Sequence, residues 1–140
     1  MSEETPSTDL LTKIKQLALE RDQGDERLLA GIVEMEALLK ELKLGVILTT
    51  KVPFEGTLIY KKEGNRWRLF LDNSEVSHCE TVVPLINGSR KTRIAAMCCF
   101  PALIAGAVDT LTSVLRQQNF AVARVQEAKD LLNAFSDAER

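Results

Sequence analysis

The apolar residues in the first third of the chain recur at steps of three and four, the spacing of one face of a helix. This pattern predicts an amphipathic helix, or a pair of helices, over residues 9–44, after a flexible tail at residues 1–8. Thr8 or Asp9 is the expected N-cap, because both side chains carry an oxygen that can accept from a free backbone N–H. The periodic positions are Leu10, Ile14, Leu17, Leu28, Ile32, Met35, Leu38 and Leu42.

A glycine interrupts this helical pattern near its middle. Gly24 costs about 1 kcal/mol inside a helix, so two readings stay open. Either the helix continues through Gly24 with support from packing, or it breaks there and Asp25 caps a second helix. Gly45 lies where a helix commonly ends.

The pattern then changes to alternation with many β-branched residues, which is typical of strands. We expect strands at 46–52, 57–62 and 66–72, with a turn at 53–56. A two-residue Gly64-Asn65 loop would form a hairpin in which these residues face each other: Lys62 and Trp67, Tyr60 and Leu69, Leu58 and Leu71. One face then holds Leu58, Tyr60, Trp67, Leu69 and Leu71. The other holds Ile59, Lys61, Arg66, Arg68 and Phe70.

A polar stretch at 72–80 predicts a loop, and residues 81–83 predict a short fourth strand that stops at Pro84. Together these segments indicate an antiparallel sheet of three to four strands over about residues 46–85. The sequence therefore predicts an α+β fold in a single domain, residues 1–140, with helices on either side of the sheet.

Residues 89–136 predict a second helical region, which Pro101 kinks or breaks. Ser89 is its expected N-cap, with the helix running from Arg90. After Pro101 the apolar positions follow a heptad spacing, which is typical of a coiled coil. The heptad positions are Ile104, Val108, Leu111, Leu115, Gln118, Val122, Val125, Lys129 and Leu132, and we expect the two polar ones, Gln118 and Lys129, to fix the register.

About 35 helical residues extend roughly 50 Å, so this helix would project beyond a compact head. Its apolar stripe needs a partner. We expect antiparallel packing on the N-terminal helix to cover part of it and a second subunit to cover the rest, which predicts a homo-oligomer.

Composition narrows the class of protein. Hydrophobic residues make up 45% of the chain and charged residues 27%, which excludes wholesale disorder. No apolar run is long enough to span a membrane, and an acidic start at residues 1–6 is unlike a secretory signal, so we expect a cytoplasmic protein. A net charge of −2 argues against a binder of duplex nucleic acid.

Catalytic chemistry has little support. His78, the single histidine, lies beside Cys79, and neighbouring residues on an extended segment point to opposite sides. Zinc ligands usually come as two spaced pairs, which Cys98-Cys99 and His78-Cys79 are not. No glycine-rich phosphate loop is present. We expect no catalytic residue, no metal and no cofactor.

A basic cluster is the main candidate for function. Residues 61–93 carry seven basic and four acidic side chains. Cations in the first turn of a helix oppose its dipole, whereas free N–H groups and arginines together suit an anion. The candidate ligand-binding residues are Arg66, Arg68, Ser89, Arg90 and Arg93. The alternative is that these cations pair with the protein's own carboxylates.

The hairpin motif Gly64-x-x-Trp67-Arg68-Leu69, followed by Ser89-Arg90-x-x-Arg93, resembles a family of small, uncharacterised bacterial and phage proteins. The resemblance covers about residues 44–105. It implies a shared α+β module and brings no activity or ligand with it.

These observations favour a non-catalytic, oligomeric binding module that captures a small anionic ligand, such as a nucleotide or phosphate. The alternative is an adaptor or inhibitor that binds another protein through its helices or an exposed sheet face.

Overall fold

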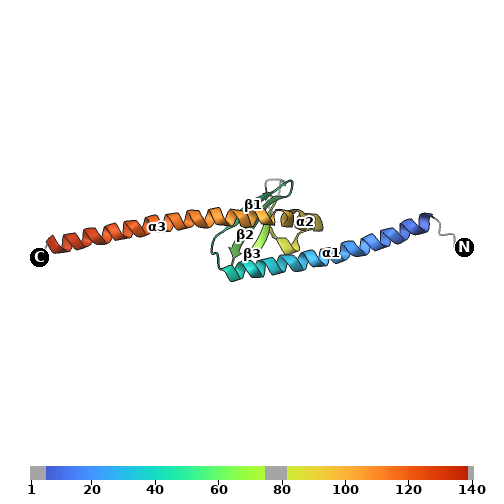
Figure 1. Cartoon of the computed structure of the whole chain (residues 1–140), viewed down its shortest axis with the longest axis horizontal. Helices are drawn as coiled ribbons and strands as arrows, with labels where there is room; N and C mark the ends of the chain where they lie inside the picture. The colour runs from blue at the N-terminus through green and yellow to red at the C-terminus, as the bar shows by residue number, and fades with distance from the viewer. Residues whose placement is uncertain (1–5, 75–81, 139–140) are drawn as a thin grey trace.

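The computed structural model describes residues 6–74 and 82–138. It confirms the α+β fold: a four-stranded antiparallel sheet lies between two long helices (Figure 1). In chain order the elements are α1 (Pro6–Leu42), β1 (Leu48–Val52), β2 (Gly56–Glu63), β3 (Arg66–Asp72), β4 (Val82–Pro84), the 3₁₀ turn η1 (Leu85–Asn87), α2 (Arg90–Cys98) and α3 (Phe100–Ala138).

Helix α1 begins earlier than the sequence pattern predicts. It starts at Pro6, so the predictions that residues 6–8 belong to a tail and that Thr8 or Asp9 is the N-cap are wrong. Residues 1–5 of the predicted tail lie outside the described residues. Proline suits a first helical turn because its missing N–H would have no partner there and its φ is already helical. Asp9 lies in that first turn, where its negative charge favours the helix dipole.

The helix continues through Gly24, which settles the open question of a break in favour of one helix. It ends at Leu42, because Lys43 adopts a left-handed φ of 50° and its N–H returns to the Lys40 carbonyl at 3.2 Å. Gly45 has a φ of 65° but lies beyond the end of the helix. The first strand accordingly begins at Leu48, two residues later than predicted.

The predicted hairpin register is confirmed. In the β2–β3 pair Lys62 faces Trp67, Tyr60 faces Leu69 and Leu58 faces Leu71, as predicted. Gly64 supplies the positive φ of 61° that the two-residue loop requires. Strand β4 then adds to the open edge of β3, giving the order β1-β2-β3-β4.

The turn between β1 and β2 has an unusual backbone. Glu55 donates its N–H to the Val52 carbonyl at 3.1 Å, while Phe54 adopts a φ of 66° and Gly56 a φ of 130°. A Cβ atom at Gly56 would lie 2.1 Å from the backbone oxygen of Asp72. Only glycine fits this close approach of β2 to the end of β3.

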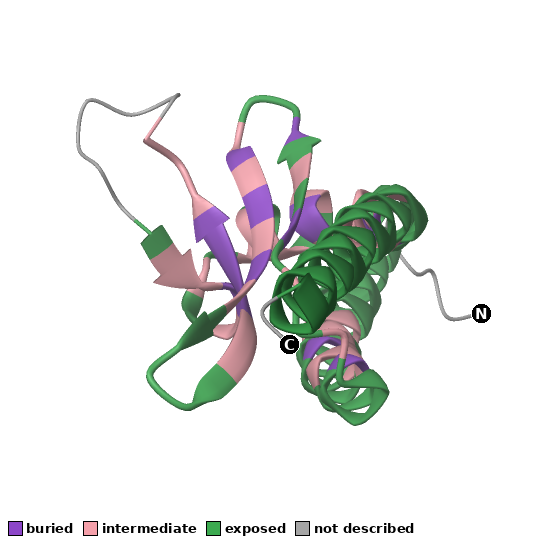
Figure 2. Ribbon diagram, turned by 90° about the vertical axis from the view of Figure 1, so that its left-hand side faces the viewer, coloured by how far each residue is buried: buried purple, intermediate pink, exposed green. Residues whose placement is uncertain are grey.

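The core lies between one sheet face and the three helices, and it uses the face that alternation predicts (Figure 2). Helix α3 packs on β1, and α1 lies beside β3 and η1. Trp67 packs at the margin of the core and remains half-buried. The buried residues of this core are Ile32, Leu39, Leu48, Val52, Leu58, Tyr60, Leu69, Leu71, Leu85, Ala96, Leu103 and Ala107. Phe70, on the opposite face of β3, is also buried.

The break at Pro101 is confirmed. Helix α2 ends at Cys98 and α3 begins at Phe100, with a bend of 47° between their axes, and Pro101 occupies the first turn of α3. No single helix in the described part of the chain is long and apolar enough to cross a membrane. Of the described helices, only α2 and α3 counted together, across the bend between them, have the necessary length and apolar composition.

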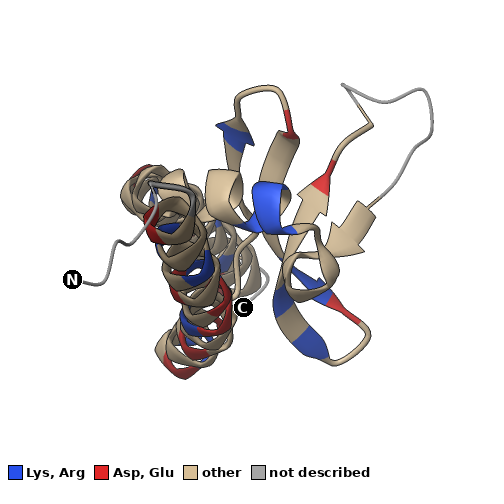
Figure 3. Cartoon of the chain, turned by 90° about the vertical axis from the view of Figure 1, so that its right-hand side faces the viewer, with Lys and Arg blue, Asp and Glu red and all other residues tan. Residues whose placement is uncertain are grey.

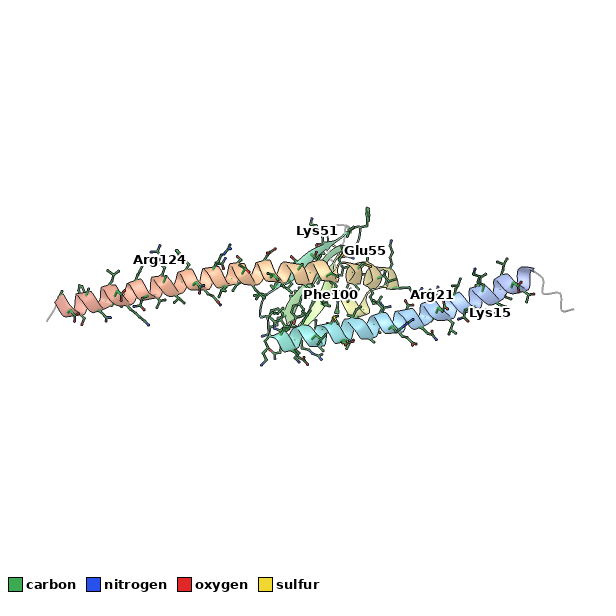
Figure 4. All side chains as sticks on the ribbon, in the orientation of Figure 1. Lys15, Arg21, Lys51, Glu55, Phe100 and Arg124 are labelled. Carbon is green, nitrogen blue, oxygen red and sulfur yellow. The ribbon has the colours of Figure 1, made fainter. Side chains whose placement is uncertain are left out.

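The two long helices do not cover each other, so the prediction of antiparallel packing between them is wrong. They run in the same direction and project from opposite sides of the head (Figure 1). We call residues 8–23 of α1 the α1 arm and residues 115–138 of α3 the α3 arm; every residue in both is exposed. Lys15 and Arg21 mark the first arm and Arg124 the second (Figure 4).

Candidate functional site

Basic residues lie close together at two places on the head, the end of the β2–β3 hairpin and the first turn of α2 (Figure 3). Of the five predicted ligand-binding residues, Arg66 and Arg68 lie on the hairpin. Ser89, Arg90 and Arg93 lie at the start of α2. Arg66 and Arg68 border a cleft beside α1, Arg90 borders a cavity beside the β1–β2 turn, and Ser89 borders a third cavity beside η1. The structure therefore does not bring all five residues around one cavity.

Ser89 caps α2 as predicted: its side-chain oxygen accepts the N–H of Thr92 at 3.2 Å. The Thr92 hydroxyl in turn donates to Glu55 at 3.3 Å. The other oxygen of the Glu55 carboxylate lies 3.7 Å from Lys91. A carboxylate from the β1–β2 turn thus balances charge at the start of this helix.

Arg90 also has an internal partner. Its Nε lies 2.6 Å from the carboxylate of Asp25 on α1, a charge-assisted hydrogen bond that joins the two helices. Arg93 differs, because its Nε is buried without a hydrogen-bond partner among the described residues. The helix start is therefore largely neutralised by the protein's own carboxylates, which is the alternative that the sequence left open.

An apolar cavity of about 530 Å³ lies beside the β1–β2 turn. Phe54 at its rim is 93% exposed and has a left-handed φ, which is rare for a bulky residue. Ile94 of α2 lines the same cavity and is also exposed. The sequence pattern indicates only a turn at residues 53–56 and does not reveal this surface, although a phenylalanine at a turn position is a signal for it.

The cleft beside the hairpin has a volume of about 310 Å³. It forms because β4 pairs only with residues 70–72 of β3, so the outer edge of β3 before residue 70 lies next to α1 instead of another strand. Its walls combine cations, one carboxylate, an indole and aliphatic side chains. The lining residues are Val33, Glu36, Ala37, Lys40, Arg66, Trp67, Arg68 and Ile86.

Glu36 is the carboxylate in this cleft, and its side chain is only 15% exposed. Burial raises the pKa of Glu36, while Arg68, the backbone N–H of Leu69 and Arg66 oppose that rise. The Nε of Arg68 lies 4.0 Å from one carboxylate oxygen. This separation is too long for a hydrogen bond, so burial outweighs the attraction.

The other Glu36 oxygen, Oε1, is buried without a hydrogen-bond partner among the described residues. Buried polar atoms are usually paired, so an unpaired one in a cleft marks a candidate functional site. Glu36 was not among the predicted site residues. A signal existed, because Glu36 lies four residues after Ile32 and three before Leu39, both of which are buried.

Trp67 connects the cleft with the core. Its ring stacks on Tyr60 with centroids 5.3 Å apart and an interplanar angle of 29°, while another part of the residue lines the cleft. Burial, and then the nearby Glu36 charge, raises the pKa of Tyr60, which keeps the phenol neutral.

Each arm carries a second kind of candidate surface, an exposed apolar stripe at heptad spacing. On the α3 arm, Val122 is 67% exposed and Leu132 is 69% exposed. The exposed large apolar residues of the α1 arm are Leu10, Leu11, Ile14, Leu17 and Leu19. Those of the α3 arm are Leu115, Phe120, Val122, Val125, Leu131, Leu132 and Phe135.

Comparisons with protein families, curated proteins and solved structures find no match to this chain. The resemblance of the hairpin and helix start to small bacterial and phage proteins therefore stays a prediction. His78 and Cys79, which the zinc and dyad hypotheses concern, lie outside the described residues.

Proposed function

We propose that the protein is a non-catalytic interaction module that assembles with further copies of itself through its two helical arms. The observation that carries this proposal is the exposed apolar stripe on each arm. Most of the stability of a protein helix comes from packing its apolar face, and a helix of this kind standing alone in water is marginal. The arms of 16 and 24 residues need a partner that a single chain does not supply.

A second copy is a suitable partner because charge does not oppose it. Each arm carries three basic and three acidic side chains and is therefore neutral. On the α3 arm, Arg124 pairs with Glu127 at 2.9 Å and Gln126 donates to Asp130 at 3.0 Å, so polar contacts support the helix itself. Two copies can approach without net repulsion between their arms.

The size of the stripes favours an assembly that uses both arms. The arms extend about 24 Å and 36 Å, and a helix is about 10 Å wide. Pairing the α3 arms alone would bury roughly 700 Å² in total, below the roughly 1,000 Å² that a biological interface needs. A symmetric dimer that covers all four arms would bury roughly 1,200 Å² and reaches that size.

Helix content measured against protein concentration tests this proposal. We expect far-UV circular dichroism to weaken on dilution, because arms that lose their partner fray. Val125→Asp places a charge in the stripe and should reproduce the diluted signal at high concentration. Ala123→Asp, on the opposite side of the same helix, is the matched control and should behave as the parent does. Helix content that is unchanged by dilution and by Val125→Asp would contradict the proposal.

A further inference from the structure

The cleft between α1 and β3 has the features of a ligand-binding site, and it is separate from the two arms. Its lining brings together three cations, Lys40, Arg66 and Arg68, against the single carboxylate of Glu36. Its volume of about 310 Å³ is at the lower end of the range for small-molecule sites. A net positive cleft of this size suits a small anion.

The other lining residues of the cleft favour a larger ligand over a bare inorganic anion. Trp67 borders the cleft, and Val33, Ala37 and Ile86 are apolar lining residues. These side chains contribute nothing to binding a hydrated ion, but they suit a planar ring, since bases stack on aromatic side chains.

Glu36 adds a specific requirement. Its Oε1 is buried within the lining and accepts no hydrogen bond from the described residues. A carboxylate oxygen only accepts, so the group that satisfies it must carry an N–H or O–H donor. A ligand with a phosphate, a ring and a donor would match the cations, the indole and this oxygen together.

We propose that the cleft binds a nucleoside monophosphate, with its phosphate on Arg66 and Arg68, its base against Trp67 and a donor of the base or sugar on Glu36. Arg66 has no ion pair shorter than 4.0 Å with the described residues and is free to form a bidentate contact with phosphate. The cleft belongs to the head of a single chain, so this inference does not depend on the assembly of the arms.

Trp67 is the only tryptophan of the chain, so its fluorescence reports binding in this cleft directly. We would titrate the full chain with AMP, GMP, CMP and UMP, and separately with adenosine and inorganic phosphate. At least one monophosphate should give a saturable change, and its nucleoside and phosphate alone should each bind more weakly. No saturable change with any of the four up to millimolar concentration would overturn the proposal, as would phosphate alone binding equally well.

Variants identify the site. Arg66→Ala should weaken the monophosphate about 10- to 100-fold, the effect of losing one charge-assisted contact. Arg124→Ala, on the distant α3 arm, is the matched control and should leave affinity unchanged. If Arg66→Ala does not fold, as judged by circular dichroism, Lys40→Ala takes its place with the same expected direction. Affinity that is unchanged in a folded Arg66→Ala or Lys40→Ala variant would show that the cleft is not the site.

Discussion

Replacing Gly56 with alanine tests how the β1–β2 turn meets the end of β3. Gly56 has a φ of 130°, a conformation that only glycine adopts freely and that costs other residues about 1–3 kcal/mol. The new Cβ would also meet the Asp72 carbonyl oxygen at 2.1 Å, its carbon at 2.9 Å and the Asn73 Cα at 3.0 Å. All three atoms belong to the backbone, so no side-chain rotation relieves the clash.

The strands must separate to admit this methyl group. Gly56 pairs with Val52, and its neighbour Thr57 pairs with Asp72, so separation loosens the sheet at one end. Losing one ladder hydrogen bond costs a further 0.5–1.5 kcal/mol, roughly, which brings the expected total to about 3 kcal/mol. That is a large part of the roughly 5–15 kcal/mol that stabilises a typical domain.

Urea unfolding followed by Trp67 fluorescence is the assay, because this signal reports the head and not the arms. Gly64→Ala is the matched control: Gly64 also has a positive φ, 61°, but nothing lies within 4 Å of its added Cβ. It should cost only the left-handed conformation, about 1–2 kcal/mol. If Gly56→Ala destabilises no more than Gly64→Ala does, the close approach to Asp72 is refuted.

Three further predictions concern the head. Trp67→Ala should cost about 2–3 kcal/mol in urea unfolding followed by circular dichroism, less than a fully buried tryptophan, because Trp67 is half-buried against Tyr60; unchanged stability would contradict the stacking. Glu36→Gln should stabilise the protein at neutral pH. Because burial raises the pKa of Glu36 in the folded state, the stability of the native protein falls as the pH rises from 4.5 through that raised pKa. Glutamine does not ionise and therefore removes this loss. The gain should shrink as pH falls toward 4.5, and a gain independent of pH between 4 and 8 would refute the burial argument. Arg90→Ala should lower the melting temperature more than Arg93→Ala does, because only Arg90 forms an ion pair with a carboxylate of the described residues, Asp25 of α1 at 2.6 Å. The opposite order would count against this assignment.

The parts of the fold that depend on local chemistry were predictable. The β2–β3 register follows from a two-residue loop and strict alternation, both of which lie within residues 56–72. The cap at Ser89 and the bend at Pro101 likewise depend on a few adjacent residues. The bounds of some elements were wrong: α1 starts at Pro6, because a proline at a first turn gives no apolar signal, and β1 starts at Leu48, two residues later than predicted.

The parts that depend on distant contacts were not predictable. Apolar periodicity shows that α1 and α3 each have a face to cover, but it carries no information on their direction or stagger, and the antiparallel prediction failed for this reason. The partner of Arg90, Asp25, lies 65 residues away. The cleft exists because β4 pairs with only three residues of β3, a length that the sequence around Pro84 did not fix.

The central claim is that the arms are covered by another copy of the chain, and the molar mass of the intact protein in solution tests it most directly. Sedimentation equilibrium at micromolar concentration should give twice the 15.6 kDa of one chain, or a higher multiple. The Val125→Asp variant should shift that mass toward one chain, while Ala123→Asp should not. A parent protein that remains at 15.6 kDa across the micromolar range would contradict the account.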